Sequence, residues 1–462
     1  MFPYKSGLVR CYGIMNIKHW GLAGVVLLLL FFIAGGRGEK QSKLATSPAG
    51  NGAMITRATL KQGARERPDD TFVRREIGAV VPAEQIVTAQ VSLFGRKRRV
   101  LARELAKRHG IELHPGAEKF FDAVERGHWA EIEAAFKEIN GGDSSAGFNS
   151  KRPQELTYIW PAIVDAYGAA QQAQLVPAEN LLEYGNAILD SLKPGMIYVG
   201  GTDASRWIPA LLNETETGQR HLLLTQNAFA DATYLDYVKL QYEGSLNVLD
   251  HEDSARAFQE YLDDAARRYR HDQDSPNEPK QVRPAEEIKM DDGKVSVGGP
   301  VAVMTINEKL LQRLMDKNPD QSFAIGESFP FPSTYAEATP LGPLMELRAG
   351  EREPFTQARA EESAAFWRDA AGRLLNDPDA LKSETVPRIY SHDAASAANL
   401  LAARGFNEQA EEAYRVSRNL WPANPEAAVR LSELLARTGR AEEGRRLLDD
   451  FRRQYPKEAE SI

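Results

Sequence analysis

A self-similarity at a spacing of 34 residues is the feature of this chain that most constrains its fold. The residues paired at that spacing are Gly405 with Gly439, Ala410 with Gly444, Tyr414 with Leu448 and Pro422 with Pro456. Glycine permits a tight turn between two helices, and a small residue lets those helices approach closely. An apolar residue fills the space between them, and proline ends the second helix. The period therefore predicts two stacked helical hairpins over about residues 393–456.

This pattern resembles the tetratricopeptide-repeat family over roughly residues 393–455. The sequence departs from the family at Ala394, where tryptophan is common, and at Gly444, where alanine is usual. The resemblance implies a concave surface that binds a peptide of another protein. The alternative is a structural cap packed on the main domain. Because such units stabilise one another by stacking, we expect the two repeats to dock on a neighbouring helix at 361–375.

Short apolar runs alternate with helical patterns in the middle of the chain. Strands are expected at Met196–Val199, His221–Thr225, Leu246–Val248, Phe323–Ile325 and Leu344–Leu347, and a β-hairpin is expected around 287–297. Strands that alternate with helices are typical of a parallel sheet with right-handed crossovers. The predicted fold class is therefore α/β over residues 193–350, a parallel sheet with flanking helices. We expect a helical region at 76–192 and an all-α tail at 351–462.

The amino-terminal region has the pattern of an export signal. Residues 20–36 are uncharged and follow basic residues, and Arg37 ends the run. Residues 1–36 are therefore predicted to be a cleaved signal peptide or a short apolar helix that anchors the chain in a membrane, with a buried core helix as the alternative. Residues 37–75 are polar and read as a flexible linker. We expect the bulk of the chain outside the cytoplasm, either membrane-anchored or exported.

Composition excludes several classes of partner and site. The net charge of −8 argues against nucleic-acid binding, which usually needs a basic surface. Cys11 is the one cysteine, so no intrachain disulfide can form and no disulfide-linked partner is expected. The chain carries none of the common phosphate-binding, dinucleotide-binding, serine-hydrolase or zinc-protease motifs, and no cofactor is predicted.

Polar residues gather where the predicted strands end, which is where parallel sheets bind ligands. The candidate ligand-binding residues are Gly200, Gly201, Thr202, Asp203, Arg206, Thr225, Gln226, Asn227, Asp231 and Glu327. Gly200 and Gly201 would let a ligand approach the backbone. Asp203, Asp231 and Glu327 could together hold a divalent cation through oxygen ligands. The alternative is that the two aspartates begin helices, where the dipole favours them.

The segment from Tyr198 to Tyr242 carries a second resemblance. It is similar to a family of uncharacterised, amino-terminally anchored bacterial proteins, over perhaps residues 118–347. More distantly, it resembles the soluble tails of membrane glycosyltransferases of the protein O-mannosyltransferase type, in which a strand ends in a Gly/Asp-rich loop before a helix. This chain lacks the many membrane spans of those enzymes. The resemblance therefore implies a recognition module of an envelope-glycan system and no transferase activity.

These observations predict a membrane-tethered, non-enzymatic binding or scaffold protein of the cell envelope, with protein contacts made by the repeat tail. One alternative is a metal-dependent enzyme that acts on carbohydrates or phosphate esters. The other is a purely structural assembly protein.

Overall fold

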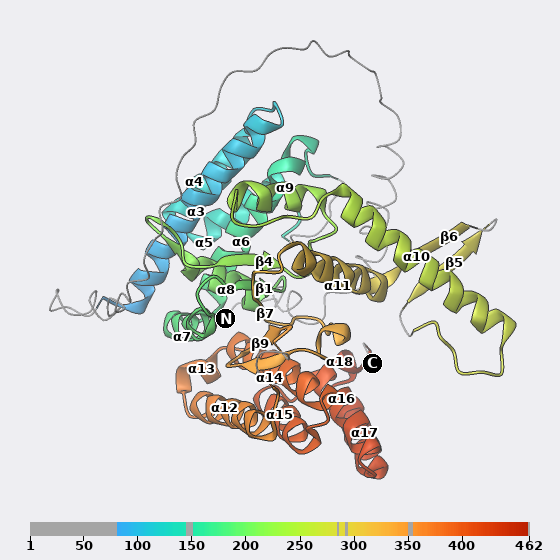
Figure 1. The fold of residues 1–462 in the computed structure, drawn as a ribbon. Helices are drawn as coiled ribbons and strands as arrows, with labels where there is room; N and C mark the ends of the chain where they lie inside the picture. The colour runs from blue at the N-terminus through green and yellow to red at the C-terminus, as the bar shows by residue number, and fades with distance from the viewer. Residues whose placement is uncertain (1–80, 145–150, 284–285, 292–293, 350–353, 461–462) are drawn as a thin grey trace, which may run out of the picture.

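The computed structural model describes residues 81–144, 151–283, 286–291, 294–349 and 354–460. It is mostly helical (66%) and contains a small mixed sheet. The fold class predicted from sequence is therefore confirmed only in part: helices make up most of the chain, and the sheet is not purely parallel. Figure 1 shows the sheet in the middle, with the amino-terminal helices on one side and the tail on the other.

Helices precede the first strand. They are α3 (Ala83–Arg108), α4 (Pro115–Arg126), α5 (Trp129–Ile139), the 3-10 helix η3 (Gln154–Ile159), α6 (Trp160–Leu175) and α7 (Ala178–Ser191). Gly127 ends α4 with a φ of 74°, a conformation that glycine adopts at little cost. The core of this region is aromatic: the rings of Phe136 and Tyr167 stack with centroids 3.7 Å apart, and Phe120 packs beside Phe136.

In the described residues, five strands form the central sheet in the order β4-β1-β7-β9-β8. They are β1 (Ile197–Gly200), β4 (Leu222–Thr225), β7 (Phe323–Ile325), β8 (Thr339–Leu341) and β9 (Leu344–Leu347). β1 pairs in parallel with β4 and with β7, as the sequence predicts. β9 runs antiparallel to β7 and to β8, which corrects the expected parallel sheet. Only two residues, Gly342 and Pro343, join β8 to β9, and so short a link permits antiparallel pairing alone.

The strand expected at Leu246–Val248 is absent from the described structure, where these residues lie in a loop. The side chain of Asn318 replaces a neighbouring strand here. Its Oδ1 accepts a hydrogen bond from the backbone N–H of Asn247 at 2.9 Å, and its Nδ2 donates to the carbonyl of Asn247 at 3.0 Å. The backbone polar groups of Asn247 are thus satisfied without a sheet ladder.

Helices and short hairpins connect the strands. They are α8 (Ala204–Asn213), β2 (Glu214–Thr215), β3 (Gly218–Gln219), α9 (Ala232–Gln241), α10 (His251–Asp274), β5 (Glu287–Asp291), β6 (Lys294–Gly298), α11 (Gly299–Lys317) and η4 (Pro332–Thr334). The antiparallel pair β5–β6 is the hairpin predicted around 287–297. Figure 1 shows that the far end of α10 and this hairpin project from the rest of the molecule.

The tail is entirely helical in its described residues. Its helices are α12 (Gln357–Leu375), α13 (Pro378–Lys382), α14 (Thr385–Ala403), α15 (Asn407–Leu420), α16 (Pro425–Arg437), α17 (Ala441–Gln454) and α18 (Pro456–Ala459). α14 pairs with α15, and α16 pairs with α17. The helix expected to support the repeats is α12, which packs against α15. α14 packs against β8 and β9, so the first hairpin also sits on the sheet.

The residues paired by the 34-residue spacing occupy corresponding places in these hairpins. Gly405 and Gly439 lie in the turns with φ of 83° and 85°. Ala410 is fully buried, Tyr414 is buried and Leu448 is half-buried. A Cβ added to Gly444 would lie 2.7 Å from the carbonyl oxygen of Ser432, so two helices touch there. α15 and α17 end two residues before Pro422 and Pro456 respectively.

The expectation of a transmembrane helix is contradicted in the described part of the chain, where no helix is both long and apolar enough to cross a membrane. The apolar segment 20–36, the linker 37–75 and Cys11 lie outside the described residues.

We expect Gly405→Ala to destabilise the protein by about 1–2 kcal/mol, because a side chain disfavours positive φ. Gly372→Ala in α12 is the matched control: a Cβ has open space at both sites, but only Gly405 has positive φ. Alanine within a helix should stabilise by about 0.5–1 kcal/mol. Urea unfolding followed by circular dichroism measures both changes. Equal effects of the two substitutions would contradict the role assigned to the turn glycine.

Candidate functional site

Three loops that follow neighbouring strands meet at one edge of the sheet. The loop after β1 carries Thr202, the loop after β4 carries Gln226 and Asn227, and the loop after β7 carries Ser328. Asn227 Nδ2 donates to Thr202 Oγ1 at 3.4 Å, and Gln226 Oε1 accepts from the backbone N–H of Ser328 at 3.1 Å. Gln226 Nε2 also donates to the carbonyl of Phe329 at 2.8 Å. Thr202, Gln226 and Asn227 of the predicted set therefore lie together with Ser328 at this edge.

The side chain of Asp203 links the loop after β1 to the loop after β7. Its Oδ2 accepts a hydrogen bond from Ser328 Oγ at 2.7 Å. Its Oδ1 accepts from Ser205 Oγ at 2.7 Å and from the backbone N–H of Ser205 at 2.9 Å, which caps the start of α8. Both carboxylate oxygens are thus occupied by donors, and Asp203 holds Ser328 in place.

The cluster lies where the strand order reverses. β1 is between β4 and β7, so the chain leaves β1 toward one side of the sheet and returns later on the other side. In open α/β sheets, ligands bind beyond the carboxyl ends of the strands at such a switch point. Thr202, Asp203, Asn227 and Ser328 are half-buried, and the adjacent Phe329 is 40% exposed. The edge therefore presents polar groups and an aromatic side chain to solvent.

The two glycines have a different role from the one expected. A Cβ on Gly201 would lie 1.5 Å from Ser328 Oγ, and a Cβ on Gly200 would lie 2.9 Å from Cα of Arg206. They allow the loop to pack against Ser328 and against α8, so the space beside them is filled by the protein itself.

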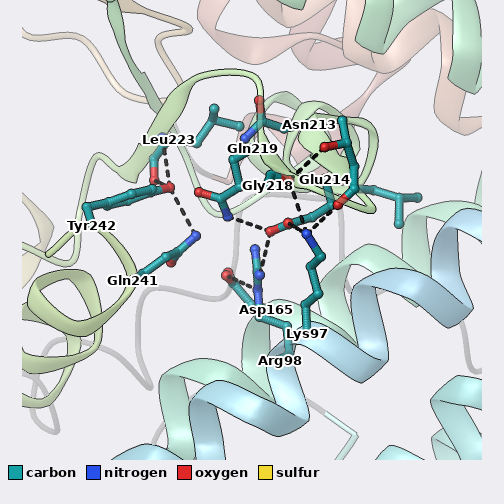
Figure 2. A network of polar contacts seen from close by, with 12 residues as sticks. Lys97, Arg98, Asp165, Asn213, Glu214, Gly218, Gln219, Leu223, Gln241 and Tyr242 are labelled. Carbon is teal, nitrogen blue, oxygen red and sulfur yellow. Dashed lines mark hydrogen bonds and ion pairs between the residues drawn. The ribbon is translucent and has the colours of Figure 1, made fainter. Parts of the chain in front are cut away.

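Arg206 is also placed differently from the prediction. It is 1% exposed and belongs to a buried ionic network on α3, α6, α8, β2 and α9. Its Nη2 lies 3.4 Å from both carboxylate oxygens of Asp165. Arg98 donates to Asp165 at 3.2 Å and to Glu214 at 2.7 Å, and the Tyr237 hydroxyl donates to Asp165 at 2.6 Å. Figure 2 shows Arg98 between Asp165 and Glu214.

This network shifts the pKa of its central carboxyl. Burial alone would raise the pKa of Asp165, but Arg206 and Arg98 outweigh burial and hold it below its ordinary value. Sequence reasoning missed Asp165 because 41 residues separate it from Arg206 and it lies in an apolar helix. A lone charged residue in a helix that is otherwise apolar or uncharged is the signal that could have found it.

The three carboxylates proposed to hold a cation do not converge on one site. Asp203 binds Ser205 and Ser328, whereas Asp231 caps α9 by accepting from the backbone N–H of Thr233 at 2.8 Å. Glu327 is buried and accepts from the Tyr335 hydroxyl at 2.9 and 3.0 Å. In the described residues no group of three His, Cys, Asp or Glu side chains could hold a metal. The helix-start interpretation therefore fits Asp203 and Asp231, and Glu327 is not a metal ligand in this arrangement.

Thr225, the remaining candidate, is buried at the end of β4, and its backbone N–H donates to the Tyr234 hydroxyl at 2.6 Å. It supports α9 against the sheet and does not reach the edge.

The tail supplies residues that the sequence did not point to. Ser396 of α14 donates to the carbonyl of Glu327 at 2.8 Å, and Asp393 of α14 accepts from the Tyr184 hydroxyl at 2.7 Å. One side of the strand ends is thus covered by a helix that begins nearly 60 residues after β7. Nothing in the local pattern of α14 distinguishes these two residues from ordinary polar positions of a helix.

No family model, no curated protein and no solved structure matches this chain. The resemblances to tetratricopeptide repeats and to glycosyltransferase tails therefore rest on the sequence patterns alone.

Proposed function

We propose that this chain is a non-enzymatic binding and scaffold protein that recognises a neutral, hydroxyl-rich ligand such as a glycan. The connected cluster of Thr202, Asp203, Gln226, Asn227 and Ser328 at the switch point is the observation that carries the proposal. The cell envelope as its location follows from the export-like pattern of residues 20–36 and stays a prediction from sequence.

The chemistry of the cluster favours an uncharged ligand. Its half-buried members carry two hydroxyls, one amide and one carboxylate that is already bonded to Ser205 and Ser328, and the single arginine of the predicted set, Arg206, is paired with Asp165. A phosphate ester would normally be met by an arginine or lysine fork. In the described part of the chain, the buried Oδ1 of Asn227 has no hydrogen-bond partner. A ligand hydroxyl that displaced the atoms covering this oxygen would satisfy it, and the exposed Phe329 offers an apolar surface to the face of a sugar ring.

The tail supports the scaffold part of the proposal. α17 buries only Gly444 and Phe451, and most of its remaining side chains are exposed. Tyr414, by contrast, is buried and donates to Asn399 at 2.7 Å, so it stabilises the hairpin and is not a contact residue. We propose that protein partners bind the outer surface of α16 and α17.

Saturation-transfer NMR with neutral β-linked glucose and N-acetylglucosamine oligomers tests the ligand class. The variants Asp203→Ala and Asp231→Ala are matched, because each removes the cap of the helix after its strand. Only Asp203→Ala also frees Ser328. We expect binding to weaken about 10–100-fold in Asp203→Ala, because Ser328 loses its hydrogen bond to a charged group. Binding should persist in Asp231→Ala.

No saturation transfer from the wild-type protein to any of these oligomers would refute the ligand class. Equal losses in the two variants would show that helix capping, and not the cluster, explains the effect. Stabilisation by a divalent cation that disappears in Asp203→Ala would instead favour the metal-dependent enzyme.

A further inference from the structure

The contact between α14 and the sheet edge contains two buried carboxyl groups. Asp393 is 8% exposed and Glu327 is 4% exposed. Asp393 accepts from the hydroxyl of Tyr184 on α7, and Glu327 accepts from the hydroxyl of Tyr335 and from the backbone N–H of Phe331 at 2.6 Å. Ser396 joins the two sides by donating to the Glu327 carbonyl. Both carboxyls are thus part of the surface on which the tail docks.

The groups around these carboxyls are neutral or acidic. Asp393 is faced by Tyr184 of α7, Tyr198 of β1, Asp203 of the loop after β1 and Tyr390 of its own helix. Glu327 is faced by Tyr335, by Asn399 of α14 and by Glu426 of α16. The hydroxyl of Tyr414 on α15 lies behind Asn399. Cations in this part of the molecule serve other groups: Arg430 of α16, which faces Glu426, pairs with Glu433. Arg206 pairs with Asp165, and Arg404 donates to the carbonyls of Tyr335 and Ala338. In the described residues, neither carboxyl forms an ion pair.

Ionisation at this contact would therefore be costly. The pKa of Asp393 is raised to about 8, chiefly by burial and in smaller part by the nearby Asp203, against the opposing effect of the Tyr184 hydrogen bond. The pKa of Glu327 is likewise raised to about 8, chiefly by burial and in smaller part by Glu426, although hydrogen bonds from Phe331, Tyr335 and Asn399 oppose the rise. A buried carboxylate without a counter-charge destabilises whatever contact encloses it.

We propose that the contact between α14 and the sheet edge is a pH-dependent latch, closed while Asp393 and Glu327 carry protons and weakened when they ionise. The unfolded or undocked carboxyls have pKa values of about 4. The closed state consequently binds more protons between pH about 4 and about 8, and its stability falls as pH rises through that window. Opening would move α14 away from Glu327 and the adjoining loop of the polar cluster. The latch depends on this interface alone and holds whatever the ligand is.

Hydrogen–deuterium exchange of the full chain between pH 6 and pH 9, corrected for intrinsic exchange, tests the latch. We expect protection of α14 peptides to fall about tenfold or more at pH 9, because Asp393 and Glu327 are then ionised and opening exposes their charges to water. Protection of α6 peptides should change little. The double variant Asp393→Asn, Glu327→Gln retains acceptors for the tyrosine hydroxyls and cannot ionise. It should keep α14 protected at both pH values.

Protection of α14 that is unchanged between pH 6 and pH 9 in the wild-type chain would overturn the proposal. A fall of the same size in the double variant would also overturn it, because the effect would then come from other groups. Should the double variant fail to fold, the wild-type titration and the single variant Asp393→Asn, which should show a smaller fall, decide the question.

Discussion

Asp165→Asn is expected to destabilise the protein by about 3–5 kcal/mol, because it removes one partner of a buried ionic network. Asparagine has nearly the shape of aspartate, so the packing of α6 is preserved. The negative charge between Arg98 and Arg206 disappears, however, and Glu214 alone remains to compensate two buried guanidinium groups. Figure 2 shows how close Asp165 and Arg98 lie. Urea unfolding at pH 7 measures the difference in the free energy of unfolding.

Asp190→Asn is the matched control for this substitution. Asp190 pairs with Arg220 at 2.7 Å, but both side chains reach solvent, so the loss should be about 0–1 kcal/mol. Similar losses in the two variants would show that the buried network contributes no more than a surface pair.

The Asp165 network also predicts a direction of pH dependence. Because the pKa of Asp165 is held below its ordinary value, its stabilisation is complete above the unfolded value of about 3.9 and is lost as pH falls through the folded value. The free energy of unfolding of Asp165→Asn should therefore fall less steeply with decreasing pH than that of the wild-type protein. The buried carboxyls at α14 act in the opposite direction, so acid weakens one part of the molecule and alkali weakens the other.

Trp367→Ala should cost about 3–5 kcal/mol, the usual loss when a large buried aromatic side chain is truncated. Trp367 is 1% exposed and lies on α12, which packs against α14, α15 and β8. A cavity there removes support from the first hairpin of the tail and from its contact with the sheet. Thermal unfolding followed by circular dichroism, together with exchange of α15 peptides, measures both consequences.

Trp367→Phe separates packing from hydrogen bonding at the same site. In the described part of the chain the indole N–H has no acceptor, so phenylalanine removes an unsatisfied polar group while retaining most of the apolar area. We expect it to cost clearly less than alanine. A loss as large as that of Trp367→Ala would contradict this expectation, because it would show that retaining most of the apolar area does not preserve stability at this site.

Much of the local structure was predictable because it depends on neighbours in sequence. The apolar runs at 196–199 and 221–225 are adjacent parallel strands, and Asp203 and Asp231 begin the helices that follow them. The turn glycines are equally local, since their positive φ is a property of the turn itself.

The errors concern partners that are distant in sequence. β9 pairs antiparallel with β7 across the loop and the strand β8 that separate them in sequence, and Asn247 finds its partner in the side chain of Asn318 and not in a strand. Arg206 was expected at the edge of the sheet but lies in the core, where it pairs with Asp165. Glu327 was expected to face a ligand but faces Tyr335 beneath α14.

The sequence by itself determined four strands of the central sheet, the starts of α8 and α9, and that three strand ends carry polar loops, because turns, caps and hydrophobic periodicity act over a few residues. Only the tertiary structure decided which of those polar groups reach solvent. Asp203, Asn227 and Ser328 stay at the edge, whereas Glu327 is enclosed by a helix that follows it by almost 60 residues. The physical reason is that burial and charge compensation depend on which segments meet in space. Contacts between distant segments produce no periodic pattern in the sequence.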